Sequence, residues 1–184
     1  MIVVYGGTSS GKSNIAENIA TAIAGEERKL FYVATMENKS DAAKERIKHH
    51  KELRAGKGFE TIEEELSMKT IAPKVENGVV LLECISNLAA NIMFAESGEK
   101  PIDKSEADKY AFKIYEEIEA LNEAAELVAV ANNIFSDGYS SDAWVDGYMK
   151  VLGKVNELIA EDAEVFIEVT AGIENVIKGE KFWQ

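Results

Sequence analysis

The stretch MIVVYGGTSSGKSN (1–14) decides the fold, because it joins an apolar run to a glycine-rich turn and then to a helix-like segment. The turn fits the pattern G-x-x-x-x-G-K-[ST], in which glycines let the backbone curl around a phosphate at the start of a helix. The eight matching residues are Gly6, Gly7, Thr8, Ser9, Ser10, Gly11, Lys12 and Ser13. We therefore predict a phosphate-binding loop between a strand and a helix.

Two side chains of this turn have expected roles in nucleotide chemistry. Lys12 is expected to reach the terminal phosphates, and the Ser13 hydroxyl is expected to ligate Mg²⁺. The positive end of the following helix adds attraction for an anion. The alternative is an ordinary glycine-rich turn that happens to carry Lys-Ser, but the strand before it and the helix after it favour a phosphate loop.

Apolar runs and helical stretches alternate along the rest of the chain. Strands are predicted at 2–5, 30–34, 79–83, 127–131 and 165–169, and helices at 12–24, 40–54, 85–95, 103–124 and 142–160. Such alternation indicates an α/β fold with a mainly parallel sheet and helices on both faces. The 184 residues, 46% of them hydrophobic, are enough for one domain spanning 1–184. Segment 95–108 is interpreted as a surface loop, in which Asp103 or Ser105 caps the next helix.

The charge of the chain excludes several function classes. Its 33 acidic and 20 basic residues give a formal net charge of −13, which disfavours nucleic acid and anionic lipid as partners. The one cysteine, Cys84, is expected in a buried strand and forms no internal disulfide. No apolar run is long enough to span a bilayer, and no basic leader opens the chain. We expect a soluble cytoplasmic protein without a membrane anchor.

The strand VVLLE (79–83) places an acidic residue, Glu83, at its carboxyl end. Ligands of α/β proteins collect at this edge of the sheet, and Mg²⁺ prefers carboxylate and hydroxyl oxygens. We therefore expect Glu83 to share the metal with Ser13. The alternative is a strand-terminal glutamate that faces solvent.

The segment KERIKHHKELRAGK (44–57) is positively charged in an otherwise acidic chain, with six Lys or Arg against two Glu. Such an island suits a polyphosphate, although a solvated basic helix face is the alternative. It contains both histidines, His49 and His50, which point about 100° apart on a helix. Because Ala43, Ile47 and His50 share one stripe, His49 is the better candidate nucleophile, with a metal-ligand role as the competing one.

Several segments in order along the chain resemble one known family, the bifunctional adenosylcobinamide kinase / adenosylcobinamide-phosphate guanylyltransferases of cobalamin assembly. These segments are GGTSSGKS (6–13), YVATM (32–36), RIKHHK (46–51), LLECISNL (81–88) and GKVNELIAEDAEVFIEVTAGI (153–173). The resemblance covers nearly the whole chain. It implies a P-loop NTPase-like fold, ATP and GTP as substrates with Mg²⁺, a corrinoid acceptor and trimeric assembly.

The resemblance also implies roles for single residues. The guanylylated histidine of the family falls on His49. Its other nucleotide contacts, beyond the Gly6–Ser13 turn, fall on Thr35, Met36, Glu37, Arg54, Glu63 and Glu83. A nucleoside triphosphate would phosphorylate adenosylcobinamide, and GTP would then guanylylate the product through the histidine.

Two segments depart from the family pattern. VANNIFSDGYS (130–140) carries Asn133 where the family has a glutamate and lacks its proline, and DGYMK (146–150) replaces an arginine-containing segment. Two alternatives therefore stay open. Either only one of the two activities is retained, or the chain is a nucleotide-dependent regulatory ATPase without a corrinoid substrate.

Overall fold

The computed structural model describes residues 1–36, 45, 54, 56–98, 100–135 and 142–183. Three residues singled out from the sequence, Glu37, His49 and His50, lie outside these ranges, as does most of the helix expected at 40–54.

The described residues form a seven-stranded sheet with the order β3-β2-β4-β5-β1-β6-β7. Its strands are β1 (Ile2–Gly6), β2 (Leu30–Ala34), β3 (Phe59–Glu63), β4 (Val79–Glu83), β5 (Glu126–Asn132), β6 (Val165–Thr170) and β7 (Ile173–Lys178). All neighbouring pairs are parallel except β6 and β7. The expected mainly parallel sheet is therefore confirmed.

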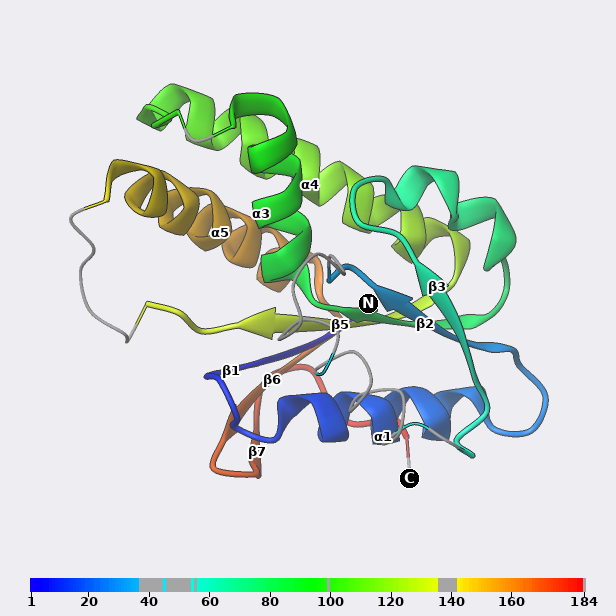
Figure 1. The fold of residues 1–184 in the computed structure, drawn as a ribbon. Helices are drawn as coiled ribbons and strands as arrows, with labels where there is room; N and C mark the ends of the chain where they lie inside the picture. Colours follow the sequence, from blue (N-terminus) through cyan, green and yellow to red (C-terminus); the bar gives the residue numbers. More distant parts are fainter. Residues whose placement is uncertain (37–44, 46–53, 55, 99, 136–141, 184) are drawn as a thin grey trace.

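Helices cover both faces of this sheet, as expected. Helix α1 (Lys12–Ala24) lies on one face, and α3 (Ile85–Ser97), α4 (Lys104–Ala124) and α5 (Ala143–Asp162) lie on the other (Figure 1). Two short 3₁₀ helices, Met68–Thr70 and Ala72–Lys74, precede β4. The three-layer arrangement explains why the central strands are apolar at nearly every position, since both faces of each strand are covered.

Each face of the sheet has its own hydrophobic core. On β1, Ile2 and Val4 pack in the core beneath α1, whereas Val3 packs in the core beneath α3, α4 and α5. On β4, Leu81 and Leu82 divide in the same way, and both are fully buried. The period-2 geometry of a strand sends neighbouring side chains to opposite cores.

Two edge strands, β3 and β7, were not predicted from the sequence. β3 reads FETIE, with Glu60, Thr61 and Glu63 exposed, and β7 reads IENVIK, with only Val176 less than exposed. Edge strands lack the continuous apolar run of a buried strand, so composition alone does not reveal them. The 95–108 loop is shorter than expected, because α3 continues to Ser97 and α4 begins after its cap.

The caps of α4 and α5 are acidic side chains. Asp103 accepts hydrogen bonds from the backbone N–H groups of Ser105 and Glu106, and Glu106 completes the capping box. Asp142 caps α5 through the N–H groups of Trp144 and Val145. These caps satisfy backbone donors that have no partner in the first helical turn.

The carboxyl ends of β1, β2, β4 and β5 meet along one edge of the sheet. The register pairs Gly6 with Asn132 and Ala34 with Glu83. The phosphate loop, the acidic end of β4 and the amide end of β5 are therefore brought together by strand pairing. Within the described residues, no helix is both long enough and apolar enough to span a membrane.

Candidate nucleotide-binding site

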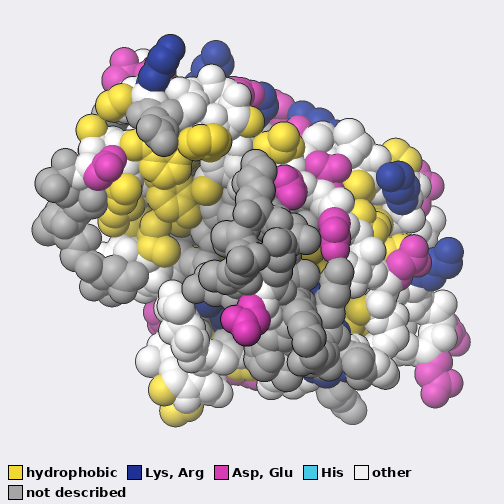
Figure 2. Space-filling model, in the orientation of Figure 1, with side chains coloured by type: hydrophobic (Ala, Val, Ile, Leu, Met, Phe, Trp, Pro, Cys, Tyr) yellow, Lys and Arg dark blue, Asp and Glu magenta, His cyan; other side chains and the backbone are white. Residues whose placement is uncertain are grey.

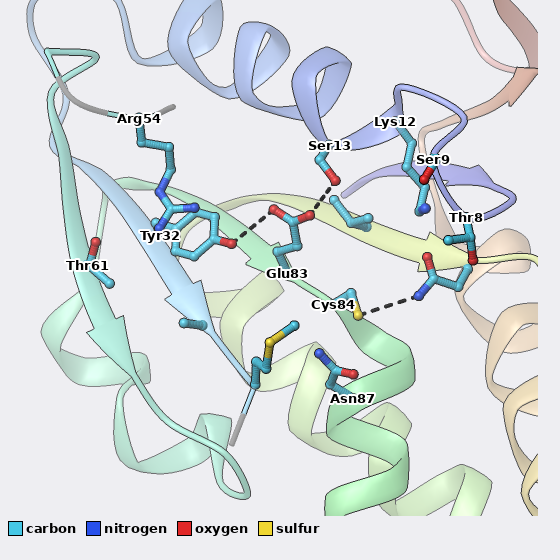
Figure 3. A pocket seen from close by; sticks show the side chains of 14 residues that line it. Thr8, Ser9, Lys12, Ser13, Tyr32, Arg54, Thr61, Glu83, Cys84 and Asn87 are labelled. Atoms are coloured by element: carbon cyan, nitrogen blue, oxygen red, sulfur yellow. Dashed lines mark hydrogen bonds between the residues drawn. The ribbon is translucent and has the colours of Figure 1, made fainter. Parts of the chain in front are cut away.

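A pocket of about 450 Å³ opens at this edge of the sheet (Figure 3). Its described lining comes from the phosphate loop, the ends of β2, β4 and β5, β3 and the start of α3. The lining residues are Thr8, Ser9, Lys12, Ser13, Tyr32, Ala34, Met36, Arg54, Thr61, Glu83, Cys84, Asn87, Val130 and Asn132.

The turn before α1 has the geometry of a phosphate loop. Ser9 and Gly11 have positive φ angles of 59° and 95°, and the N–H of Ser10 donates to the carbonyl of Gly7 at 3.2 Å. Gly6 must stay a glycine, since a Cβ there would lie 2.6 Å from the carbonyl oxygen of Val169. No described side chain caps the start of α1, so the first backbone N–H groups of the helix are available to an anion.

Lys12 lies at the pocket with its ammonium held by the loop itself. Its side chain is nearly buried, and Nζ donates to the carbonyl of Gly7 at 2.9 Å. Burial lowers the pKa of the Lys12 ammonium, while the neighbouring Cys84 and Glu83 act in the opposite direction. The ammonium has one hydrogen-bond acceptor among the described residues, which leaves two of its three donors for phosphate oxygens.

The carboxylate of Glu83 accepts hydrogen bonds on both of its oxygens. Oε1 accepts from the hydroxyl of Ser13, and Oε2 accepts from the hydroxyl of Tyr32 at 3.0 Å (Figure 3). Glu83 thus faces the pocket at the start of α1 and not open solvent. Burial and the charge of Glu83 raise the pKa of Tyr32, so the phenol is a stable hydrogen-bond donor.

Arg54 lies against the face of Tyr32 at the same pocket. Its guanidinium carbon is 3.3 Å from the ring centroid, and only 6% of the residue is exposed. Neither Nε nor Nη1 of Arg54 has a hydrogen-bond partner in the described part of the chain. A buried cation with unpaired donors is costly unless an anion pairs with it, which makes Arg54 a candidate phosphate contact.

An ion pair ties the chain after Arg54 to α1. Lys57 Nζ lies 2.6 Å from the carboxylate of Glu17, which is 3% exposed. The N–H of Lys57 also donates to the carbonyl of Arg54 at 3.0 Å. Because Glu17 lies one helical turn after Ser13, this pair fixes the chain near the face of α1 that carries Ser13.

The other residues singled out from the sequence have different positions. Met36 lines the pocket. Thr35 is fully buried, and its hydroxyl accepts the N–H of Cys84 at 3.0 Å and lies 3.0 Å from the carbonyl of Cys84. Thr35 and the exposed Glu63 at the end of β3 are not among the described residues that line the pocket.

Several lining residues were not predicted from the sequence, notably Tyr32 and Asn132. Tyr32 lies inside the apolar run LFYVA, and although it begins the segment YVATM, neither pattern distinguishes it from a core residue. Asn132 could have been found, because it is a polar residue at the carboxyl end of a strand. Its amide donates to the hydroxyl of Ser86 at 2.6 Å, whereas the backbone N–H of Asn133 donates to the carbonyl of Gly6.

Ser13 and Glu83 are oxygen ligands of the kind that Mg²⁺ prefers. Among the described residues there is no group of three or more His, Cys, Asp or Glu that could hold a metal alone. That finding fits Mg²⁺ bound to a nucleotide, because this ion keeps waters and takes most of its other ligands from phosphates. The hydrogen-bonded Ser13–Glu83 pair is thus a suitable protein side for such an ion.

A second hollow, of about 540 Å³, lies away from the phosphate loop. Its described lining is Phe94, Pro101, Asp142, Ala143 and Trp144. Hydrophobic side chains gather over α3 and α5 in Figure 2. The hollow offers no described basic side chain to a phosphate, so the first pocket is the candidate nucleotide site.

Two comparisons at the sequence level cover almost all of the chain. The sequence pattern of the family described as "Cobinamide kinase / cobinamide phosphate guanyltransferase" matches residues 2–177. The "Bifunctional adenosylcobalamin biosynthesis protein CobU" of Escherichia coli (strain K12) is 31% identical over 188 residues, with 97% of this chain and 99% of that protein covered. The protein of the same name from Salmonella typhimurium is 30% identical, with the same coverage.

A comparison with solved structures supports the fold. One ATPase domain superposes with a TM-score of 0.52 at 10% identity, covering 91% of this chain and 68% of that one. A "prototypical ATPase from the type III secretion system of pathogenic bacteria" superposes with a TM-score of 0.53 at 12% identity, covering 92% of this chain and 51% of that one. These similarities show the P-loop NTPase fold and nothing about substrate. The family match and the two relatives carry the assignment: the chain belongs to the cobinamide kinase / cobinamide phosphate guanyltransferase family.

Proposed function

We propose that this protein phosphorylates adenosylcobinamide with a nucleoside triphosphate and then transfers GMP from GTP to the resulting phosphate. The observation that carries the proposal is the arrangement of Lys12, Ser13 and Glu83 in one pocket of a chain that belongs to this family. Family membership supplies the substrates, and the pocket supplies a place for the nucleotide.

Binding of the triphosphate falls to the turn and to Lys12. Backbone N–H groups at the start of α1 and the Lys12 ammonium converge on the position of an anion. Arg54 brings guanidinium donors without a described partner to the same pocket. These groups offset the negative charge that would otherwise keep a triphosphate from so acidic a protein.

Ser13 and Glu83 would hold Mg²⁺ against the phosphates. The bound ion would neutralise charge on the phosphate oxygens and, by polarising them as a Lewis acid, would make the transferred phosphorus more electrophilic. For this the hydroxyl and the carboxylate must lie close together, and the hydrogen bond between them holds them so.

His49 is proposed as the nucleophile of the guanylyl transfer. A neutral imidazole nitrogen attacks the α-phosphorus of GTP, a P–N bond forms, and the bond to pyrophosphate breaks. A phosphate oxygen of adenosylcobinamide phosphate then attacks the same phosphorus, and the P–N bond breaks to regenerate the histidine. Arg54 follows His49 by five positions in the sequence, a span of at most about 18 Å even when fully extended.

Incubation with α-labelled GTP and Mg²⁺ tests this function. The expected result is an acid-labile protein adduct that adenosylcobinamide phosphate discharges, together with phosphorylation of adenosylcobinamide in a separate assay. If only guanylyl transfer or only phosphorylation is observed, the protein has a single activity. Hydrolysis stimulated by a partner protein, with no adduct and no corrinoid product, would indicate a regulatory ATPase.

Three further proposals follow from the sequence and the family resemblance. The chain folds as one domain over residues 1–184, works in the cytoplasm and assembles as a homotrimer. The single cysteine, Cys84, is buried and suits a reducing compartment. Light scattering after size-exclusion chromatography measures the oligomeric state, and a mass of one or two chains would contradict the trimer.

A further inference from the structure

Tyr32 contacts two charged groups of the nucleotide pocket that come from different parts of the chain. Its hydroxyl donates to Glu83 Oε2 at 3.0 Å, and its ring face carries the Arg54 guanidinium at 3.3 Å. We propose that Tyr32 is a positioning residue that orients the Glu83 carboxylate toward Ser13 and seats Arg54. Through these contacts Tyr32 couples the Mg²⁺ site to the segment that ends at Arg54. This inference rests on the proposed function, because that function places Mg²⁺ at Ser13 and Glu83.

The Tyr32 ring is held in place on several sides. The residue is 4% exposed, and Phe59 meets it edge to face with the ring centroids 6.2 Å apart. With Arg54 against its face, the ring has little room to swing. The hydroxyl is therefore aimed at Glu83 by the packing of the ring.

The hydrogen bond decides how Glu83 is presented to the metal. A carboxylate can rotate about its side-chain bonds, and Tyr32 holds Oε2 while Oε1 lies against the Ser13 hydroxyl. Hydrogen bonds of this kind fix the orientation of metal-binding groups and tune their affinity. Loss of the phenol hydroxyl removes the hydrogen bond that holds Oε2 and leaves only the Ser13 contact to orient the carboxylate.

Through Arg54, Tyr32 contacts the stretch of chain that follows His49 in the sequence. The chain on its other side is anchored by the Lys57–Glu17 ion pair, so Arg54 lies between a fixed point and the segment that contains His49. The guanidinium covers one face of the Tyr32 ring, whose hydroxyl holds Glu83. Arg54 and the proposed metal site are thus linked through one ring.

Tyr32→Phe tests the hydroxyl while retaining the ring that carries Arg54. Mn²⁺ in place of Mg²⁺ is titrated by electron paramagnetic resonance in the presence of a non-hydrolysable GTP analogue. The expected result is a metal affinity about ten- to a hundredfold weaker than in the wild-type protein. Tyr148→Phe is the matched control, because that hydroxyl donates to the carbonyl of Ser86 at 3.0 Å and not to Glu83. The control should leave metal affinity unchanged.

A double-mutant cycle separates positioning from general damage to the fold. If Tyr32 acts through Glu83, Tyr32→Phe causes no further loss of Mn²⁺ affinity when Glu83 is already Gln. Equal losses in both backgrounds, or an unchanged affinity of Tyr32→Phe, would overturn this inference alone. Wild-type protein without nucleotide-dependent Mn²⁺ binding would overturn the proposed function as well.

Tyr32→Leu removes the ring too and tests the link to Arg54. Its metal affinity should match that of Tyr32→Phe, while the formation of the GMP adduct at saturating metal should be slower than in Tyr32→Phe. Equal adduct rates in the two variants at saturating metal would show that the ring does not seat Arg54 for the reaction.

Discussion

The hydroxyl of Ser13 is hydrogen-bonded to the carboxylate of Glu83, 70 residues away in the sequence. One residue opens α1 and the other ends β4, so the pairing of parallel strands brings them together. The phosphate loop and the acidic strand end thus form one site.

Ser13→Ala should weaken metal-dependent nucleotide binding by about ten- to a hundredfold, because the variant loses one proposed Mg²⁺ ligand. Calorimetric titration of GTP with and without Mg²⁺ measures this, and the loss should be confined to the titration with metal. Ser97→Ala is a suitable control, since that hydroxyl donates to the carbonyl of Met93 within α3, away from the phosphate loop. An equal loss without Mg²⁺ would argue against a metal role.

Lys12→Met should weaken GTP binding by about 1.5–3 kcal/mol, the range of hydrogen bonds to charged groups. Burial lowers the pKa of the Lys12 ammonium below its ordinary value of 10.5. The charged form therefore prevails below the lowered pKa, and GTP affinity should fall as the pH rises through it. Lys12→Met should lack this alkaline loss, and Lys154→Met, which removes a surface ion pair with Glu157, should bind like the wild type. A pH profile shared by all three proteins would contradict the role of Lys12.

Leu81→Ala and Leu82→Ala should each lower the free energy of unfolding by about 2–5 kcal/mol, as for other fully buried leucines. The two residues are neighbours on β4 but belong to opposite cores, so their effects should be nearly additive. Denaturant unfolding of both single variants and the double variant measures this. A small effect of either one would mean that one face of the sheet is not packed.

Lys57→Met should leave the nearly buried Glu17 carboxylate without its partner and cost about 1–3 kcal/mol of stability, since Lys57 itself is partly exposed. Glu17→Gln combined with Lys57→Met should recover part of that loss, because no buried charge then remains. Thermal and denaturant unfolding report the stability. A double variant that is less stable than Lys57→Met would contradict a buried, uncompensated charge as the cause.

The sequence predicted the centre of the fold well, for a physical reason. β1, β2, β4 and β5 are buried on both faces, so each appears as a continuous apolar run. β6 buries Val165, Ile167 and Val169 on one face, and these apolar residues were enough to reveal it. The edge strands β3 and β7 were not predicted, because half or more of their side chains face solvent and their composition resembles that of a loop. Edge pairing depends on the rest of the sheet and not on the local sequence.

The site residues were likewise predicted where the local sequence carries a recognisable pattern, and missed where contacts arise only in the folded protein. Lys12, Ser13 and Glu83 belong to patterns whose chemistry can be read locally, and the structure brings them together. Tyr32 could not be recognised, because its role comes from contacts with Arg54 and Glu83 that only the folded sheet creates. The hydroxyl of Thr35 contacts the backbone of Cys84, and its expected nucleotide contact stays a prediction. The roles of Glu37 and His49 stay predictions, since both lie outside the described residues.

The covalent step is the centre of this account. Mass spectrometry of the intact protein after brief exposure to GTP and Mg²⁺ measures it directly, with His49→Ala and His50→Ala compared in parallel. The account predicts one added GMP on the wild-type protein and on His50→Ala, and none on His49→Ala. An unmodified wild-type protein, or a His49→Ala variant that carries the same added mass, would contradict it.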